Sequence, residues 1–291
     1  MGDSVTVMEM DGPEGISTWS VVDHERGTGL VVLAFAFCLA VVAFGRWRGV
    51  RSLVGLAITF ALLVFFFVPA VLAGTSPVVA ALVTCAAVVL VVLPLTHGTG
   101  LVAGVAVLGT LASLALTCLM AAGAVTALHL SGVTDDLSTA LEVSHGIDVR
   151  GVLLAGIMIG SLGVLDDVTV TQSATVHELA RANPGYRVRE LYAAGIRVGR
   201  AHIASVINTI VLAYAGSSLP LMILILVNND SFAGVLTDQL LTQEIVRSAV
   251  ATLGLIAAVP LTTLMAAVAA RGTLEPHEDG DEPRAVALHL H

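Results

Sequence analysis

The amino-acid sequence predicts an all-α protein that crosses a membrane about seven times. Its 291 residues are 56% hydrophobic, with a mean hydropathy of +0.94, far above the value for a soluble globular domain. Only 12% of the residues are charged, too few to cover a soluble surface of this size. The apolar residues form continuous runs of about twenty, the length that a helix needs to cross hydrocarbon. A transmembrane barrel would instead show short alternating segments.

Seven apolar runs, separated by polar segments, give the expected spans in chain order. They cover about residues 28–45, 52–73, 78–95, 101–128, 151–175, 202–227 and 248–270. Together they form a transmembrane domain over residues 28–270. Before it lies a polar, acidic N-terminal tail, residues 1–27, which has no apolar core and should be poorly ordered or loosely docked. The acidic C-terminal tail, residues 271–291, is expected to be disordered.

Arginine alone decides the expected orientation, because all thirteen basic residues are Arg. Three of them, Arg26, Arg150 and Arg247, fall in one set of loops, and the remaining ten fall in the other set. Basic loops stay in the cytoplasm, so the N-terminus is expected outside and the C-terminus inside. The acidic tail then crosses with the first helix, or the natural chain starts earlier with another helix.

Composition also excludes several classes of function. The net charge of −9 argues against binding to nucleic acid, which requires basic patches. Cys38, Cys85 and Cys118 each lie in an apolar run, as small buried residues do, and their spacing is not that of a metal site. No GxxxxGK[ST] motif is present, so the chain does not hydrolyse ATP through a P-loop. No cofactor is expected apart from a bound cation.

The fifth span carries an unusual polar stretch, GSLGVLDDVTVTQSATVHE, at residues 160–178. Ionisable groups inside a membrane segment are expensive to keep and mark functional sites. On a helical wheel, Asp166, Thr169, Ser173 and His177 share one stripe, while Asp167 lies on a neighbouring stripe lined with glycine. Both carboxylates are therefore expected to point into the helix bundle.

The sixth span adds polar residues at a similar depth. Asp166 lies roughly 22 Å along the fifth span, and Ser205, Asn208 and Thr209 lie roughly 5–11 Å into the antiparallel sixth span. Carboxylate, amide and hydroxyl oxygens suit a cation or a proton. The predicted ion- or substrate-binding residues are Asp166, Asp167, Thr169, Gln172, Ser173, Asn208 and Thr209. His177 and His202 are weaker metal candidates, because their spacing is not a known zinc pattern. His97 is interpreted as a polar loop residue.

The segment Gly216–Pro220 interrupts the sixth span. Pro220 removes a backbone donor and clashes with the carbonyl of Gly216, so the helix is expected to be kinked or broken there. A broken helix opposite an acidic helix is a common device of transporters. An ordinary proline kink, which membrane helices tolerate well, is the alternative.

The sequences GSLGVLDDVTVTQSATVHEL (residues 160–179) and VGRAHIASVINTIVLAYAGSSLPL (residues 198–221) resemble the YibE/F-like family of bacterial multipass membrane proteins. The resemblance extends over about residues 23–270. It implies a helical, multispanning protein of the bacterial plasma membrane, and it implies no particular chemistry. Many relatives carry an additional N-terminal helix and an extracytoplasmic segment before this core.

These features favour a gradient-driven transporter or channel for a cation or small solute, with Asp166 and Asp167 as the binding groups. The alternative is a non-catalytic membrane scaffold or assembly factor, with the basic segment 176–200 as its partner site. A homo-oligomer and a complex with another membrane subunit both stay open. An intramembrane aspartyl protease is disfavoured, because its two carboxylates must face each other. Asp166 and Asp167 point about 100° apart, and no other expected span carries a mid-membrane acid. No enzymatic activity is therefore expected.

Overall fold

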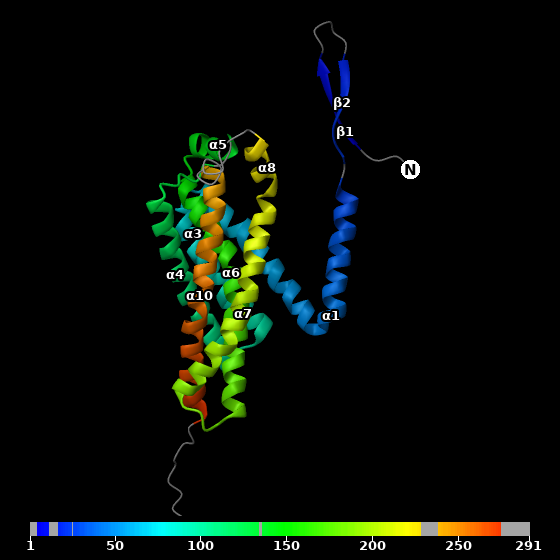
Figure 1. Ribbon diagram of the computed structural model, residues 1–291. Coiled ribbons are helices and arrows are strands. Elements are labelled where there is room, and N and C mark those ends of the chain that lie inside the picture. The colour runs from blue at the N-terminus through cyan, green and yellow to red at the C-terminus, as the bar shows by residue number, and fades with distance from the viewer. Residues whose placement is uncertain (1–4, 12–16, 25, 134–135, 228–237, 275–291) are drawn as a thin grey trace, which may run out of the picture. The chain divides into compact units, whose positions relative to one another are not determined.

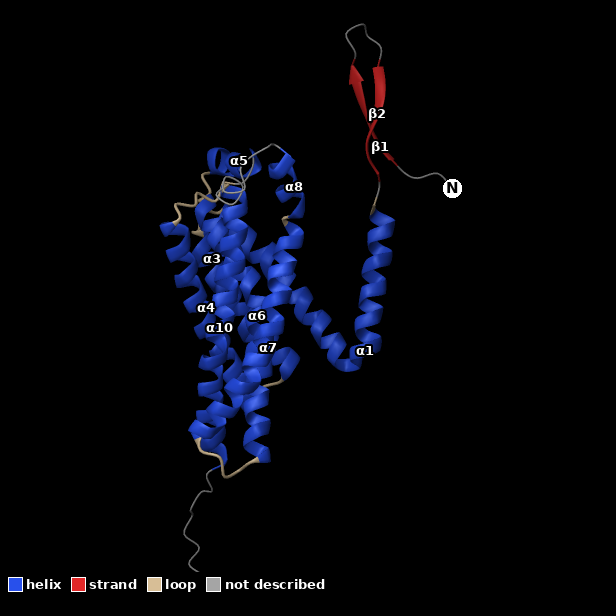
Figure 2. Ribbon diagram, viewed as in Figure 1, coloured by secondary structure: helices blue, strands red, loops and turns tan. Residues whose placement is uncertain are grey.

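The computed structural model describes residues 5–11, 17–24, 26–133, 136–227 and 238–274, which are mostly helical (Figures 1 and 2). The chain divides into two compact units, residues 1–57 and 58–291. The expected disordered tail, from residue 275 on, and the segment 228–237 lie outside the described residues.

The first unit begins with two strands, β1 (Val5–Asp11) and β2 (Ser17–His24), which pair antiparallel with a register shift between Thr6 and Val7. The expected tail thus contains a hairpin, and that it is only loosely docked stays a prediction. The sequences VTVMEM and STWSVV are rich in the β-branched and aromatic residues that favour strands.

A single apolar helical stretch follows, Gly27–Leu72, made of α1 (Gly27–Leu62), the π-helical turn η1 (Leu63–Phe67) and α2 (Val68–Leu72). Its 46 residues would extend about 70 Å as a straight helix, more than twice the hydrocarbon thickness. The helix is interrupted at Arg46, whose φ of 50° is a conformation that non-glycine residues rarely adopt. Gly49 then packs against the backbone of Val41, so the chain bends sharply here. This stretch contains both of the first two expected spans.

The second unit is a helical bundle centred on α6 (Val149–Ala182). The other helices are α3 (Pro77–His97), α4 (Leu101–Ala127), α5 (Asp136–His145), α7 (Val188–Ser217), α8 (Leu219–Val227) and α10 (Gln239–Leu274). Helices α4, α6 and α10 pack closely on one another, α3 packs on α4 and α6, and α7 packs on α6 and α10 (Figure 1). Every predicted site residue, including the weaker metal candidates His177 and His202, lies on α6 or α7.

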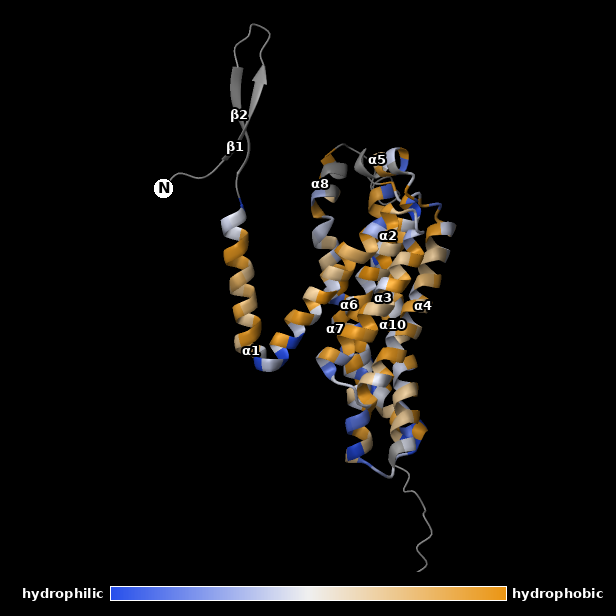
Figure 3. Ribbon diagram, turned by 180° about the vertical axis from the view of Figure 1, so that it is seen from behind, coloured by the Kyte–Doolittle hydropathy of each residue, from blue (hydrophilic) through white to orange (hydrophobic). Residues whose placement is uncertain are grey.

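Small residues allow this close packing. A Cβ at Gly109 of α4 would lie 2.6 Å from the Thr262 hydroxyl of α10, and Gly254 of α10 similarly leaves room for Thr117 of α4. Glycine and small hydroxyl residues are the usual contacts between membrane helices. Large apolar side chains such as Leu108, Leu119 and Leu253 are instead exposed. Hydrophobic residues extend along the helices of this unit (Figure 3).

The described residues contain six helical stretches long and apolar enough to cross a membrane, the first being Gly27–Leu72. The chain is therefore a helical membrane protein whose outer face contacts lipid. Two expected boundaries are wrong. Helix α6 continues to Ala182 and α7 starts at Val188, so most of the basic segment 176–200 is helical. Helix α10 starts at Gln239, which places Glu244 and Arg247 in a helix and not in a loop.

Candidate functional site

Asp166 is the carboxylate of α6 that the bundle partly buries. Its Oδ1 atom is buried and has no hydrogen-bond partner among the described residues. Asp166 interacts electrostatically with His97, at the C-terminal end of α3, and with the adjacent Asp167. The Nδ1 atom of His97 lies 2.8 Å from the Thr96 hydroxyl. The prediction of an ordinary loop residue is wrong for His97, which is the last residue of α3 and, although exposed, interacts electrostatically with Asp166.

The level of Asp166 in the bundle follows from its neighbours on α3. At the start of both helices, a Cβ at Gly151 would lie 3.2 Å from Cδ of Pro77, and His97 approaches Asp166 at the end of α3. The two helices therefore run in the same direction. The 21 residues of α3 extend about 30 Å, enough to cross hydrocarbon once. Asp166 thus lies near the level where α3 ends, and α6 continues beyond it for about 24 Å.

Asp167 has a different environment. It is exposed, as are Gly156, Gly160, Gly163 and Thr171, which follow the same side of α6. We call these five residues the glycine stripe. Only Asp166 therefore faces the bundle, and the expectation that both carboxylates point inward is wrong for Asp167.

Thr169 and Ser173 join α6 to α4 in the interior, where each is at most 1% exposed. The Thr169 hydroxyl lies 2.6 Å from the Thr110 hydroxyl, and Ser173 donates a 2.9 Å hydrogen bond to the carbonyl of Val102. Both residues share the inward side of α6 with Asp166, as the helical wheel predicted.

Gln172 joins three helices. Its Nε2 atom donates to the carbonyl of Gly195 on α7 at 2.9 Å and to the Thr263 hydroxyl on α10 at 2.8 Å. The side chain fits because α7 presents glycines to it: a Cβ at Gly199 would lie 2.8 Å from Oε1. These contacts give Gln172 a packing role, since both of its amide hydrogens are used inside the bundle.

Asn208 and Thr209 do not join the predicted site. Both are exposed on α7, and Thr209 donates to the carbonyl of Ser205 on its own helix. Among the described residues, neither makes a hydrogen bond to α6. Their depth along the helix follows from residue number, but the rotation of α7 about its axis depends on which of its residues pack. The buried residues of α7 are Leu191, Ala194, Gly195, Gly199, Ile203 and Ile210.

The two weaker metal candidates lie apart from any cluster of ligands. The described part of the chain contains no group of three or more His, Cys, Asp and Glu side chains that could hold a metal ion. His177 Nδ1 and His202 Nε2 are buried without a hydrogen-bond partner there. His177 and Ser173 line a small recess at the start of α4, together with Leu101, Val102, Val105 and Ala266.

Buried hydroxyl groups continue from Asp166 along the interface of α4, α6 and α10. Each is at most 1% exposed: Thr110, Ser113, Thr117, Ser161, Thr169, Ser173, Thr262 and Thr263. The hydroxyls of Ser113 and Thr262 have no hydrogen-bond partner among the described residues. Hydroxyl groups both donate and accept, so this interface can solvate a proton or an ion. This hydroxyl-lined interface was not predicted, although residues 110, 113 and 117 have the spacing of one helix face.

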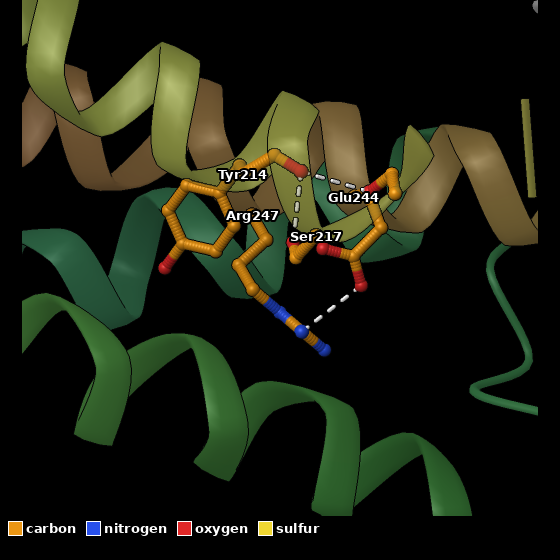
Figure 4. Close-up of polar contacts among 5 residues, drawn as sticks. Tyr214, Ser217, Glu244 and Arg247 are labelled. Atoms are coloured by element: carbon orange, nitrogen blue, oxygen red, sulfur yellow. Dashed lines mark hydrogen bonds and ion pairs between the residues drawn. The ribbon is translucent and has the colours of Figure 1, made fainter. Parts of the chain in front are cut away.

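A second polar cluster lies toward the other end of α6 (Figure 4). Arg247 Nη1 lies 3.0 Å from Glu244 Oε1, and both interact electrostatically with Tyr214 of α7. Arg247 approaches Gly156, which precedes Asp166 by about 15 Å of helix. Helix α10 carries one acid, Glu244, near its start. Its distance from Asp166 along the helix argues against a facing carboxylate dyad.

Comparison with known proteins identifies a family. No curated protein matches the chain, and no solved structure matches it either. The model of the family described as YibE/F-like protein matches residues 33–272, which include Asp166 and all of α3 to α8. Because this match covers well over half of the sequence, the chain belongs to the YibE/F-like protein family.

Proposed function

We propose that this protein is a gradient-driven transporter or channel for a cation or small solute, in which Asp166 binds the ion or proton. The observation that carries the proposal is the buried Oδ1 of Asp166, which has no hydrogen-bond partner among the described residues and lies beside His97. A carboxylate in a membrane interior costs free energy unless it holds a proton, a cation or a cationic side chain. Asp166 is thus suited to bind and release a cation.

The hydroxyl-lined interface of α4, α6 and α10 supports the same proposal. Unpaired buried hydroxyls such as those of Ser113 and Thr262 require partners, and water or a passing ion would supply them. Thr169 and Ser173 would contribute oxygens near Asp166, and the exposed Asp167 would add negative charge near the site. Gln172 would hold α6, α7 and α10 together around it.

The proposal includes an orientation and a kink. The arginine distribution favours an outside N-terminus and a cytoplasmic C-terminus in a bacterial plasma membrane, with Asp166 toward the cytoplasmic side. Helix α7 ends at Ser217 and α8 begins at Leu219, while Ser218 between them has φ −89° and ψ 0°. Pro220 cannot donate to the carbonyl of Gly216, so this junction would be the kink. A gradient-driven transporter binds and releases its substrate unchanged, so the proposal includes no catalytic reaction.

A membrane scaffold is the second candidate, and the exposure of Asp167 favours it. A carboxylate that faced lipid would cost up to about 3 kcal/mol at the bilayer centre, and less near the level where α3 ends. A second copy of the chain or another membrane subunit that covered the glycine stripe would remove this cost. Such a protein would carry no ion flux.

Flux through proteoliposomes tests the two candidates. The full chain is reconstituted in liposomes that contain a dye sensitive to H⁺, Na⁺ or K⁺, and a gradient of the matching ion is imposed in each case. Wild type should carry flux with one of these ions, and Asp166→Asn should lower it to the level of protein-free liposomes. Glu178→Gln is the matched control, because Glu178 is an exposed carboxylate of α6 that pairs with Arg181. Absence of flux for every ion, with melting temperatures independent of the cation, would reject transport and favour the scaffold.

A further inference from the structure

Arg247 of α10 uses only part of its hydrogen-bonding capacity. Its Nη1 atom lies 3.0 Å from Glu244 Oε1. Its Nε atom is buried and has no hydrogen-bond partner among the described residues. Its Nη2 atom lies 3.9 Å from the position that a Cβ at Gly156 would take. The side of the guanidinium that carries Nε and Nη2 is thus not used by Glu244, and unsatisfied donors inside a membrane protein are costly.

Tyr214 of α7 brings a hydroxyl group to the same side of α6. Its phenol oxygen lies 3.2 Å from the position of a Cβ at Gly160, and the phenol interacts electrostatically with Arg247 and Glu244. Residues 156 and 160 are one helical turn apart, so their Cβ positions are about 6 Å from each other. The guanidinium and the phenol therefore approach adjacent turns of the glycine stripe. Figure 4 shows the side chains of Tyr214, Glu244 and Arg247.

We propose that Arg247 and Tyr214 bind one oxyanion, a carboxylate or phosphate group, against Gly156 and Gly160. The Nε and Nη2 hydrogens of a guanidinium are parallel, which matches the two oxygens of such a group. Gly156 and Gly160 have no side chain, so a ligand can approach α6 closely. Glu244 keeps the guanidinium in place. Its carboxylate also competes with the bound anion for the positive charge of Arg247. The site lies about 9–15 Å along α6 from Asp166 and does not depend on the proposed transport.

Thermal stability of the purified full chain in a neutral detergent tests this site. Sodium acetate and sodium phosphate are titrated at constant ionic strength, with sodium chloride as the balancing salt. Wild type should show a saturable rise in melting temperature. Arg247→Gln should abolish the rise, and Arg247→Lys, which keeps the charge but loses the paired donors, should weaken apparent affinity about tenfold. Tyr214→Phe should weaken it about fivefold, as expected for one hydrogen bond.

Two further variants make the test specific. Glu244→Gln removes the competing carboxylate and should tighten binding about tenfold. Arg150→Gln is the matched control, because Arg150 is an exposed arginine that donates to the Thr126 hydroxyl, and its loss should leave the titration unchanged. If Arg247→Gln does not fold, the opposite effects expected for Tyr214→Phe and Glu244→Gln still decide the question.

A lipid arm identifies the source of the oxyanion. The same variants are melted in nanodiscs of phosphatidylcholine with and without phosphatidylglycerol. Stabilisation by acetate or phosphate salts that depends on Arg247 supports a soluble ligand. Stabilisation by phosphatidylglycerol alone, again dependent on Arg247, supports a lipid phosphate. Equal responses of wild type and Arg247→Gln in both arms, or unchanged responses in Tyr214→Phe and Glu244→Gln, would overturn the proposal.

Discussion

The hydroxyl oxygens of Thr110 and Thr169 lie 2.6 Å apart in the interface between α4 and α6, where neither residue is accessible to solvent. Each hydroxyl also lies within hydrogen-bond distance of a carbonyl on its own helix, Ala106 for Thr110 and Asp166 for Thr169, so either hydroxyl can be the donor that joins the two helices. The helical turn that carries Asp166 is thus fixed to α4 by its neighbour, while Oδ1 of the carboxylate has no hydrogen-bond partner among the described residues.

Thr169→Val should destabilise the protein by about 1 kcal/mol, because it keeps the shape but removes a buried hydrogen bond between membrane helices. Reversible unfolding of detergent-solubilised protein in SDS would measure the change. The control is Thr171→Val, which removes an exposed hydroxyl from the same helix and should have almost no effect. Equal effects of the two substitutions would show that the contact with Thr110 contributes nothing.

Gly199→Ala should separate α7 from α6 and α10. The added Cβ would lie 2.7 Å from Cγ1 of Val259 and 2.8 Å from Oε1 of Gln172, both in the packed interior. Overpacking of this kind typically costs about 1–3 kcal/mol, which a thermal melt would detect. Gly104→Ala is the matched helical control, since no heavy atom lies within 4 Å of its added Cβ, and it should be neutral or slightly stabilising. An unchanged melting temperature for Gly199→Ala would contradict the role of Gln172 as a link between the helices.

The sequence predicted those features that depend on the length and polarity of a run. Apolar runs of about twenty residues identify membrane helices, and adjacent aspartates in such a run identify α6 as unusual. The rotation of a helix about its axis cannot be predicted from the length and polarity of a run, because it depends on how the helix packs. Asn208 and Thr209 have the right residue types for a site with Asp166, but the packing of α7 leaves them exposed. His97 reaches Asp166 only because α3 and α6 run side by side, which no local pattern indicates.

Charged residues also misled the placement of helix ends. Because arginine is expensive in hydrocarbon, the polar loop before the seventh span is expected to end at Arg247. The structure begins α10 at Gln239 and pairs Arg247 with Glu244 one turn earlier, which lowers that cost. The spacing of three residues between opposite charges is a helix signal that could have been used.

The orientation of the bundle gives a further prediction. Single cysteines at Ala182, the last residue of α6, and at Ser144 on α5 are both exposed and lie toward opposite ends of the bundle. In intact cells, and in a background without Cys38, Cys85 and Cys118, a membrane-impermeant thiol reagent should label position 144 and not position 182, because arginine-rich segments stay in the cytoplasm. Permeabilised cells, in which both positions should react, are the control. Labelling of position 182 alone in intact cells would reverse the orientation.

The two adjacent aspartates should separate in function. Asp166 has a buried, unpaired oxygen beside His97, whereas Asp167 is exposed on the glycine stripe. The Asn amide has the same shape as the Asp carboxylate but no negative charge to hold a cation. Asp166→Asn should therefore abolish ion flux. It should also leave the melting temperature unchanged or higher, because a costly buried carboxylate is removed. Any stabilisation of the wild-type protein by its transported cation should disappear in this variant.

Asp167→Asn should retain flux within about twofold, because an exposed carboxylate is hydrated and contributes little to an interior site. Ion flux of both variants would be measured in proteoliposomes under gradients of H⁺, Na⁺ or K⁺. Thermal melts of both variants would be measured with and without the same cations. If Asp167→Asn abolishes flux while Asp166→Asn retains it, the glycine stripe is the ion path and the interior of the bundle is not. Loss of folding in Asp166→Asn would instead make the carboxylate part of the packing, since the isosteric amide changes its charge and hydrogen bonding but not its shape.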